Sequence, residues 1–211
     1  MNNVQIIDGS DDEGVVTWLA DYLSPRLAMR ETIVTIPGGE SPFPILTKLS
    51  RLDLAFSKLT VWPGDDRIVP EHHSASNVGR IRQILGPMGA TIVPLALGAQ
   101  PPHFALTWLG LGDDGHIASL FPNTKPRPDD PVSVRRLTPD PLPADAPFDR
   151  LSLTMPALLD SEQLLFVVRG AFRRRIFMEA VERRSDLPVA RLLAAASQPA
   201  TCFILRERSA L

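Results

Sequence analysis

The stretch GLGDDGHIASLFPNT, from Gly110 to Thr124, places a carboxylate and an imidazole two positions apart among closely spaced glycines. The carboxylate belongs to Asp114 and the imidazole to His116. An imidazole is largely neutral at pH 7 and can take a proton from water, and a carboxylate beside it can fix its orientation. The spacing is therefore typical of an oriented general base. Judged from spacing alone, a tight surface turn is an equally open interpretation.

The same glycines match the dinucleotide-binding pattern G-x-G-x-x-G through Gly110, Gly112 and Gly115. The residues before the third glycine are Asp113 and Asp114, whose carboxylates would repel a pyrophosphate. The acid that should hold a ribose would fall in a proline-rich stretch instead of at a strand end, where the pattern needs it. We therefore expect no nucleotide cofactor.

A cluster of potential metal ligands occurs once, at Glu71, His72 and His73. These residues are adjacent in the loop expected over 64–77, and no pair of histidines is spaced four apart on a helix. That spacing does not match a protein metal site. We expect no metal and no other cofactor.

The elements that must position these residues are short apolar runs that alternate with amphipathic ones. Strands are predicted over 4–8, 32–36, 59–63, 104–110, 150–155, 163–168 and 201–205. Helices are predicted over 11–23, 171–184 and 188–196. One further helix is predicted to begin at residue 42, and another to end at residue 84. This alternation predicts an α/β fold, a mainly parallel sheet flanked by helices. In such sheets, ligands bind beyond the carboxyl ends of the strands, where the glycine-bearing loops of this chain are expected.

Two segments do not fit a simple alternation. Only residues 96–103 separate the run TIVPL (91–95) from the strand predicted at 104–110, and a parallel crossover needs a dozen residues or more. Either these runs pair differently, or they are not neighbours in the sheet. Residues 122–147 are rich in proline and are expected to form a long irregular connection over the surface.

Composition limits the class of protein. A chain of 211 residues fits one domain, taken as 1–211. With 22 basic and 24 acidic side chains, it lacks the basic surface that broad nucleic-acid binding requires. No signal peptide and no run long enough to span a membrane is recognised. The single cysteine, Cys202, cannot form an internal disulfide, so we expect a cytoplasmic protein. The expected oligomeric state is a monomer or a homodimer.

The sequence resembles the 6-phosphogluconolactonases over most of the chain, from Ile36 to about Val181. LGLGDDGHIASLFPNT is similar to that family's L-G-x-G-x-D-G-H-T-A-S-L-F-P-G, and PGGESP is similar to its phosphate loop S-G-G-S-T-P. WPGDDRIVPEHHSASNVGRIR resembles its G-D-E-R-x-V-P stretch, and RLSLTMPALLDSEQLLFVVRGAFRR resembles its strand–helix–strand near the C-terminus. The first and third stretches are specific, whereas the glycine-pair loop alone is weak.

The resemblance implies a fold shared with glucosamine-6-phosphate deaminases and ribose-5-phosphate isomerases. It implies hydrolysis of 6-phospho-D-glucono-1,5-lactone in the oxidative pentose phosphate pathway, with His116 as base and Asp114 as its partner. The deaminases have a glutamate after their histidine, in a form like D-G-H-I-A-F-N-E-P, where this chain reads SLFP. The lactonase is therefore favoured. A deaminase-like enzyme and a non-catalytic sugar-phosphate sensor are the alternatives.

A phosphorylated lactone also needs a binding site for its phosphate. Free N–H groups at a helix N-terminus bind anions, and a guanidinium matches phosphate oxygens. Ser41 is expected to cap a helix that begins at Pro42. Arg173 could alternatively belong to a solvated helix face. The candidate substrate and phosphate contacts are Gly38, Gly39, Ser41, Asp65, Arg67, Asn77, Arg150 and Arg173.

The chain departs from the family pattern in several places. Glu40 and Ser41 stand where serine and threonine are usual, Asp66 replaces a glutamate, Ala105 an aspartate, and Arg173 a lysine. The helix that usually precedes the strand at 104–110 is missing. An acid at position 40 is unfavourable beside a phosphate unless its side chain points away or pairs with a base.

Overall fold

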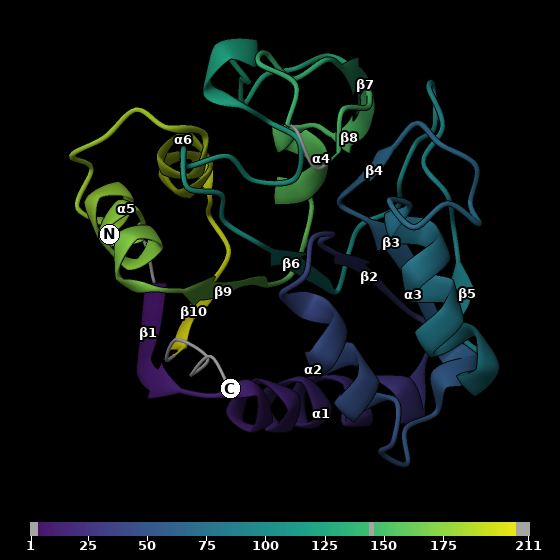
Figure 1. Cartoon of the computed structure of the whole chain (residues 1–211). Coiled ribbons are helices and arrows are strands. Elements are labelled where there is room, and N and C mark those ends of the chain that lie inside the picture. The colour runs from purple at the N-terminus through teal and green to yellow at the C-terminus, as the bar shows by residue number, and fades with distance from the viewer. Residues whose placement is uncertain (1–3, 144–145, 206–211) are drawn as a thin grey trace, which may run out of the picture.

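The computed structural model describes residues 4–143 and 146–205; the remaining parts of the predicted 1–211 domain lie outside the described residues. A seven-stranded sheet, parallel throughout, forms the centre, in the order β1-β10-β9-β6-β2-β3-β5 (Figure 1). Its strands are β1 (Val4–Ser10), β2 (Thr32–Ile36), β3 (Leu59–Pro63), β5 (Thr91–Ile92), β6 (Leu106–Leu109), β9 (Leu164–Arg169) and β10 (Ala200–Leu205). The predicted α/β class is confirmed.

Helices cover both faces of this sheet (Figure 1). One face packs against α1 (Asp12–Met29), α2 (Pro42–Leu49) and α3 (Asn77–Leu85), and the other against α4 (Met155–Leu159), α5 (Ala171–Val181) and α6 (Pro188–Ala195). In β9, Leu165 and Val167 face the first set, and Phe166 and Val168 face the second. A strand buried on both faces must be apolar at successive positions, which explains why the central strands are apolar runs without alternation.

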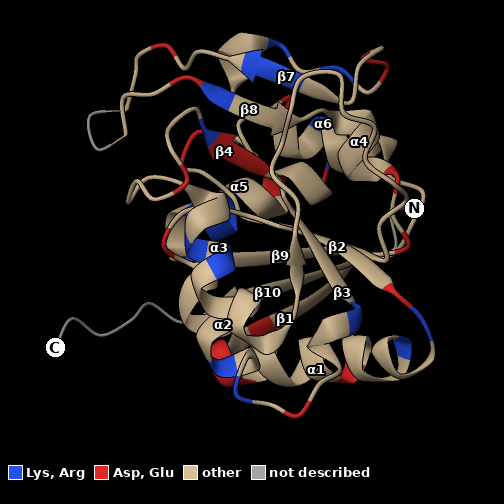
Figure 2. Ribbon diagram, turned by 90° about the vertical axis from the view of Figure 1, so that its right-hand side faces the viewer, with Lys and Arg blue, Asp and Glu red and all other residues tan. Residues whose placement is uncertain are grey.

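A second, antiparallel sheet lies beyond the carboxyl end of β3, in the order β4-β8-β7 (Figure 2). It consists of β4 (Asp65–Arg67), β7 (Val134–Leu137) and β8 (Arg150–Leu153). Three expectations were wrong here. The strand predicted to Met155 ends at Leu153 and is followed by α4; the loop predicted after 63 contains β4; and the segment 122–147 contains β7. These short strands exist only because they pair with each other, and pairing between distant segments leaves no local pattern.

The position of the run at 91–95 follows from the strand order. β5 pairs with β3 at the sheet edge, whereas β6 pairs with β2 and β9. The two runs are therefore not neighbours, and the short connection between them does not have to form a parallel crossover. No helix in the described ranges is long and apolar enough to cross a membrane.

Helix α1 runs to Met29, beyond the end predicted at residue 23, and contains Pro25. Its N-cap is Asp11, whose carboxylate accepts the N–H of Gly14 at 3.0 Å. The helix continues because Leu27 still packs against the sheet, and tertiary packing of an apolar face stabilises a helix more than local propensity does.

Candidate active site

A cleft of about 520 Å³ opens at the carboxyl ends of β9, β6, β2 and β3. The chain leaves β2 towards β3 but leaves β6 towards β9, so the sheet changes winding direction here, where α/β sheets bind ligands. The lining residues are Pro37, Gly38, Gly39, Glu40, Ser41, Asp65, Arg67, Gly110, Leu111, Gly112, His116, Ala118, Val167, Arg169 and Arg173. The loops predicted to be functional therefore meet in one place.

His116 and Asp114 form a close pair at this cleft. The Nδ1 atom of His116 lies 2.5 Å from Oδ1 of Asp114, which also accepts the backbone N–H of His116 at 3.1 Å. Partial burial alone would raise the pKa of Asp114, but hydrogen bonds and charge from His116 outweigh it, and the pKa lies below its ordinary value. An ionised Asp114 favours the tautomer with the proton on Nδ1. The Nε2 atom, which makes no hydrogen bond within the described residues, is then left as a base.

The imidazole ring is held on two further sides. A Cβ atom on Gly112 would lie 2.1 Å from the ring, so only glycine lets the backbone pass there. The centroid of the Phe121 ring is 4.6 Å from that of His116. The ring is therefore held in one orientation, as a general base requires.

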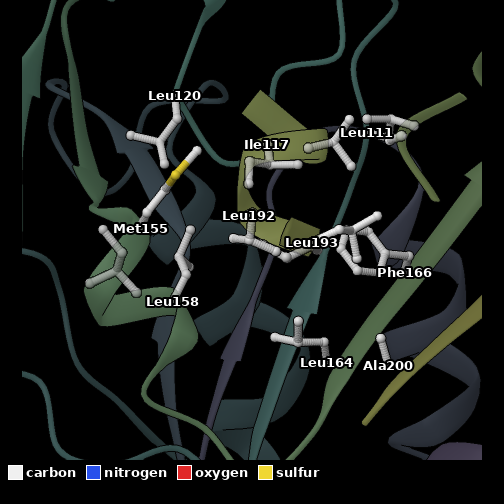
Figure 3. Packing of buried hydrophobic residues seen from close by; sticks show 14 of the residues in the cluster. Leu111, Ile117, Leu120, Met155, Leu158, Leu164, Phe166, Leu192, Leu193 and Ala200 are labelled. Carbon is white, nitrogen blue, oxygen red and sulfur yellow. The ribbon is translucent and has the colours of Figure 1, made fainter. Parts of the chain in front are cut away.

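Apolar side chains fix the loop that bears His116 to the core (Figure 3). Leu111, Ile117 and Leu120 are buried in the cluster that contains Met155 of α4 and Leu192 of α6. The histidine thus lies on a loop that buried side chains anchor in the hydrophobic core before and after it. Such anchoring prepares the site before substrate arrives.

The predicted phosphate loop leads from β2 into α2. Ser41 occupies the N-cap position, but its side chain makes no capping hydrogen bond. Its Oγ instead accepts the Nε–H of Arg169 at 2.7 Å. Gly38 packs directly against Asn77, since a Cβ on Gly38 would lie 2.0 Å from the Asn77 amide nitrogen.

Glu40 is neutralised by an arginine. Arg80 donates to its two carboxylate oxygens at 2.6 and 3.1 Å and stacks over the Phe43 ring. The hydrogen bond from Arg80 holds the pKa of Glu40 below its ordinary value, so the residue remains an anion with its own cation. The acid at this unusual position is therefore paired with a base, which meets the condition derived from the sequence.

Arg67 reaches the cleft from β4. Its Nη1 donates to the Ala75 carbonyl at 2.9 Å, and its buried Nε has no hydrogen-bond partner in the described part of the chain. Within the described residues, neither Asp65 nor Asp66 forms an ion pair with this guanidinium. Asp65 accepts from the hydroxyl of Ser119, and Asp66 accepts backbone N–H groups at the start of α3. Arg67 is thus available to a ligand.

The remaining arginines come from β9 and α5. Arg173 lines the cleft and forms an ion pair with Asp113, with Nε to Oδ1 at 2.9 Å. Arg169, the last residue of β9, also lines the cleft and pairs with Asp12. No motif in the sequence singles out Arg169. The available signal was a single charge at the carboxyl end of an otherwise apolar strand, LLFVVR.

Two predicted contacts lie outside the cleft lining. Asn77 is 1% exposed and donates to the Asp65 carbonyl at 2.9 Å. Arg150 is 3% exposed and donates to the carbonyls of Ala146 and Phe148 at 2.8 and 2.9 Å. Both side chains donate to backbone carbonyl groups, and neither residue is among those that line the cleft.

The loop at 71–73 is not arranged as a metal site. Glu71 pairs with Arg82, and Nδ1 of His73 accepts the N–H of Ala75 at 3.1 Å. Among the described residues, no group of three or more histidine, cysteine, aspartate or glutamate side chains is arranged to hold a metal ion.

Comparison with known proteins places the chain in a family. The model of "Glucosamine-6-phosphate isomerases/6-phosphogluconolactonase" matches residues 13–95 and 88–201. A 6-phosphogluconolactonase of Pseudomonas aeruginosa is 32% identical, with 86% of each chain covered. One from Helicobacter pylori is 32% identical over 76% of this chain and 78% of its own.

Solved structures agree in fold. A 6-phosphogluconolactonase from Shewanella baltica superposes with a TM-score of 0.81 at 20% identity, covering 97% of this chain and 98% of its own. The Thermotoga maritima 6-phosphogluconolactonase gives a TM-score of 0.79 at 21% identity, with 97% and 100% covered. With the family model matching nearly the whole chain and the expected loops gathered around His116, the chain belongs to the glucosamine-6-phosphate isomerase/6-phosphogluconolactonase family.

Proposed function

We propose that this protein hydrolyses 6-phospho-D-glucono-1,5-lactone to 6-phosphogluconate, with His116 as the general base. One observation carries the proposal. The His116 imidazole, hydrogen-bonded through Nδ1 to Asp114, lies in a cleft that is also lined by a glycine-rich loop and several arginines. The relatives named 6-phosphogluconolactonase support the same substrate.

The proposed chemistry needs one proton shuttle. Nε2 of His116 takes a proton from water as the water oxygen bonds to the lactone carbonyl carbon, giving a tetrahedral oxyanion. The bond from that carbon to the ring oxygen then breaks, and the imidazolium returns its proton to the ring oxygen. The new carboxylic acid ionises in water. Asp114 orients the ring and stabilises its charged form.

The other end of the cleft is proposed to bind the phosphate. Gly38, Gly39 and Ser41 precede α2, and Arg67 and Arg173 add two cations to the lining. Asp65, held by Ser119, is placed to accept a substrate hydroxyl. Interactions with the phosphate exist in both ground and transition states, so they are expected to determine KM more than kcat.

The deaminase alternative predicts a different product. The glutamate that the deaminases carry is replaced here within Ser119–Pro122, and Leu120 of that segment is buried in the core. The purified protein should therefore accelerate opening of freshly generated 6-phosphogluconolactone above the spontaneous rate and release no ammonia from glucosamine 6-phosphate. Ammonia release without lactone hydrolysis would reject the proposal, and binding without either reaction would favour the sensor.

The reaction is also expected to be independent of metal. A histidine base suffices for an activated ester, and the described residues offer no clustered ligand set. Prolonged treatment with a chelator followed by gel filtration should leave the rate of lactone hydrolysis unchanged. A loss of activity that only a divalent ion restores would contradict this expectation.

A further inference from the structure

We propose that Arg169, together with the Ser41 hydroxyl, is the principal phosphate-binding group of this cleft. This inference rests on the proposed function in taking a phosphorylated sugar as the ligand. Neither residue type nor spacing singled out Arg169 in the sequence; its role follows from the contacts of its side chain.

Two partners fix the Arg169 side chain at the cleft, and they do not occupy all of its N–H donors. Its side chain is 16% exposed, and its guanidinium lies between Asp12, at the start of α1, and Ser41, at the start of α2. Nη2 donates to Asp12 and Nε donates to Ser41. Nη1 has no hydrogen bond to any described residue, and the side chain lines the cleft. The guanidinium is therefore fixed while one of its donor groups remains available.

The contact with Ser41 also orients the serine. Because Oγ of Ser41 accepts a hydrogen bond from Arg169 at 2.7 Å, its own proton must point elsewhere. Ser41 makes no capping bond to α2 and lines the cleft, so the proton is free to point towards a bound anion. Arg169 and Ser41 together thus present neighbouring donors, a pattern that suits the oxygens of one phosphate.

Helix α2 needs such donors because its own are reduced. The first turn of a helix normally offers several free N–H groups to an anion. Here that turn begins Pro42-Phe43-Pro44, and neither proline has an N–H. The backbone at this N-terminus therefore offers fewer N–H groups to an anion than usual, and a nearby side-chain donor adds more to anion binding here.

Arg169 is better placed for this task than Arg173. The Arg173 side chain is 39% exposed and forms an ion pair with Asp113 from the His116 loop. Solvent screens an exposed charge more than a largely buried one, and long exposed side chains lose more entropy on binding. We therefore expect loss of Arg169 to weaken phosphate binding more than loss of Arg173.

The test compares Arg169→Gln and Arg169→Lys with a matched control, Arg174→Gln. Arg174 lies on α5 and also pairs with an aspartate of the N-terminal segment, Asp8, but it does not line the cleft. KM and kcat are measured with 6-phosphogluconolactone and with unphosphorylated glucono-1,5-lactone. Binding of inorganic phosphate and of 6-phosphogluconate is measured by calorimetry, which does not depend on turnover.

For Arg169→Gln we expect KM for the phosphorylated lactone to rise about ten- to a hundredfold and phosphate binding to weaken equally, as loss of a charged hydrogen bond predicts. The rate with glucono-1,5-lactone should change little, because that substrate has no phosphate. Arg169→Lys keeps the charge opposite Asp12 but lacks the planar fork, so it should fold normally and still bind phosphate more weakly. Arg174→Gln should match the unaltered protein. Ser41→Ala should add little to Arg169→Gln, because both remove one shared site.

The inference is overturned if both Arg169 variants bind phosphate like the unaltered protein. It is also overturned if the variants hydrolyse the phosphorylated and unphosphorylated lactones with equally reduced rates, because an equal loss indicates a purely structural role. It is also overturned if the unaltered protein binds neither phosphate nor 6-phosphogluconate. Should the protein bind phosphate through Arg169 but hydrolyse no lactone, the proposed function fails and the phosphate site stands. If Arg169→Gln does not fold, Arg169→Lys decides the question.

Discussion

Replacing His116 by alanine should lower kcat for 6-phosphogluconolactone by about 10²–10⁴-fold, the usual contribution of a general base, with little change in KM. The imidazole acts only as water attacks, so its loss removes an interaction made in the transition state and not in the ground state. The assay must subtract spontaneous opening of the lactone, which limits the largest decrease that can be measured.

The control for this variant is His103→Ala. His103 forms a similar pair, with Nδ1 2.6 Å from Oδ1 of Asp160, but it is half-exposed and does not line the cleft. Its loss should leave both constants unchanged. A His116→Ala protein that keeps a normal kcat would show that another group activates water.

Replacing Asp114 by asparagine should also reduce kcat, by about 10²–10⁴-fold if a neutral amide disturbs the histidine as in other oriented bases. The amide nitrogen can donate to Nδ1 and so favour the tautomer with its proton on Nε2, which can no longer accept a proton from water. The side chains have nearly the same size, so the loop should keep its shape. Circular dichroism and thermal melting check this point.

At pH values above the ordinary range of an aspartate, titration of Asp114 itself should not contribute to the effect of Asp114→Asn. The pKa of Asp114 lies below its ordinary value, so the carboxylate of the unaltered protein is already ionised throughout that range. Asp160→Asn, which changes the surface pair with His103, is the matched control and should have no effect. A variant with normal kcat would mean that Asp114 holds the loop without tuning the base.

Much of the cleft lining could be predicted because its residues follow buried strands. His116 follows β6, and Gly38 and Ser41 follow β2. The carboxyl ends of parallel strands meet at one edge of a sheet, so locating the strands placed these loops together. The close pairing of Asp114 with His116 was equally accessible, since two residues on one short turn cannot lie far apart.

Other parts of the site depend on contacts between segments far apart in the chain. The pairing of β4 with β8, which positions Arg67, joins residues about eighty-five positions apart and has no local pattern. Glu40 and Arg80 are also far apart in the chain, and no local pattern predicts their ion pair. This pair neutralises the unusual acid in the predicted phosphate loop.

The sequence by itself determined the fold class, the family and the loop that carries the proposed base, because these depend on apolar periodicity and on residues adjacent in the chain. Only the tertiary structure decided which polar side chains line the cleft. Asn77 and Arg150, expected as substrate contacts, lie outside the lining and donate to backbone carbonyls, whereas Arg169 was not expected and lines the cleft. The direction and partners of a long polar side chain are set by whatever packs around it, and at Arg169 those neighbours come from the starts of two different helices.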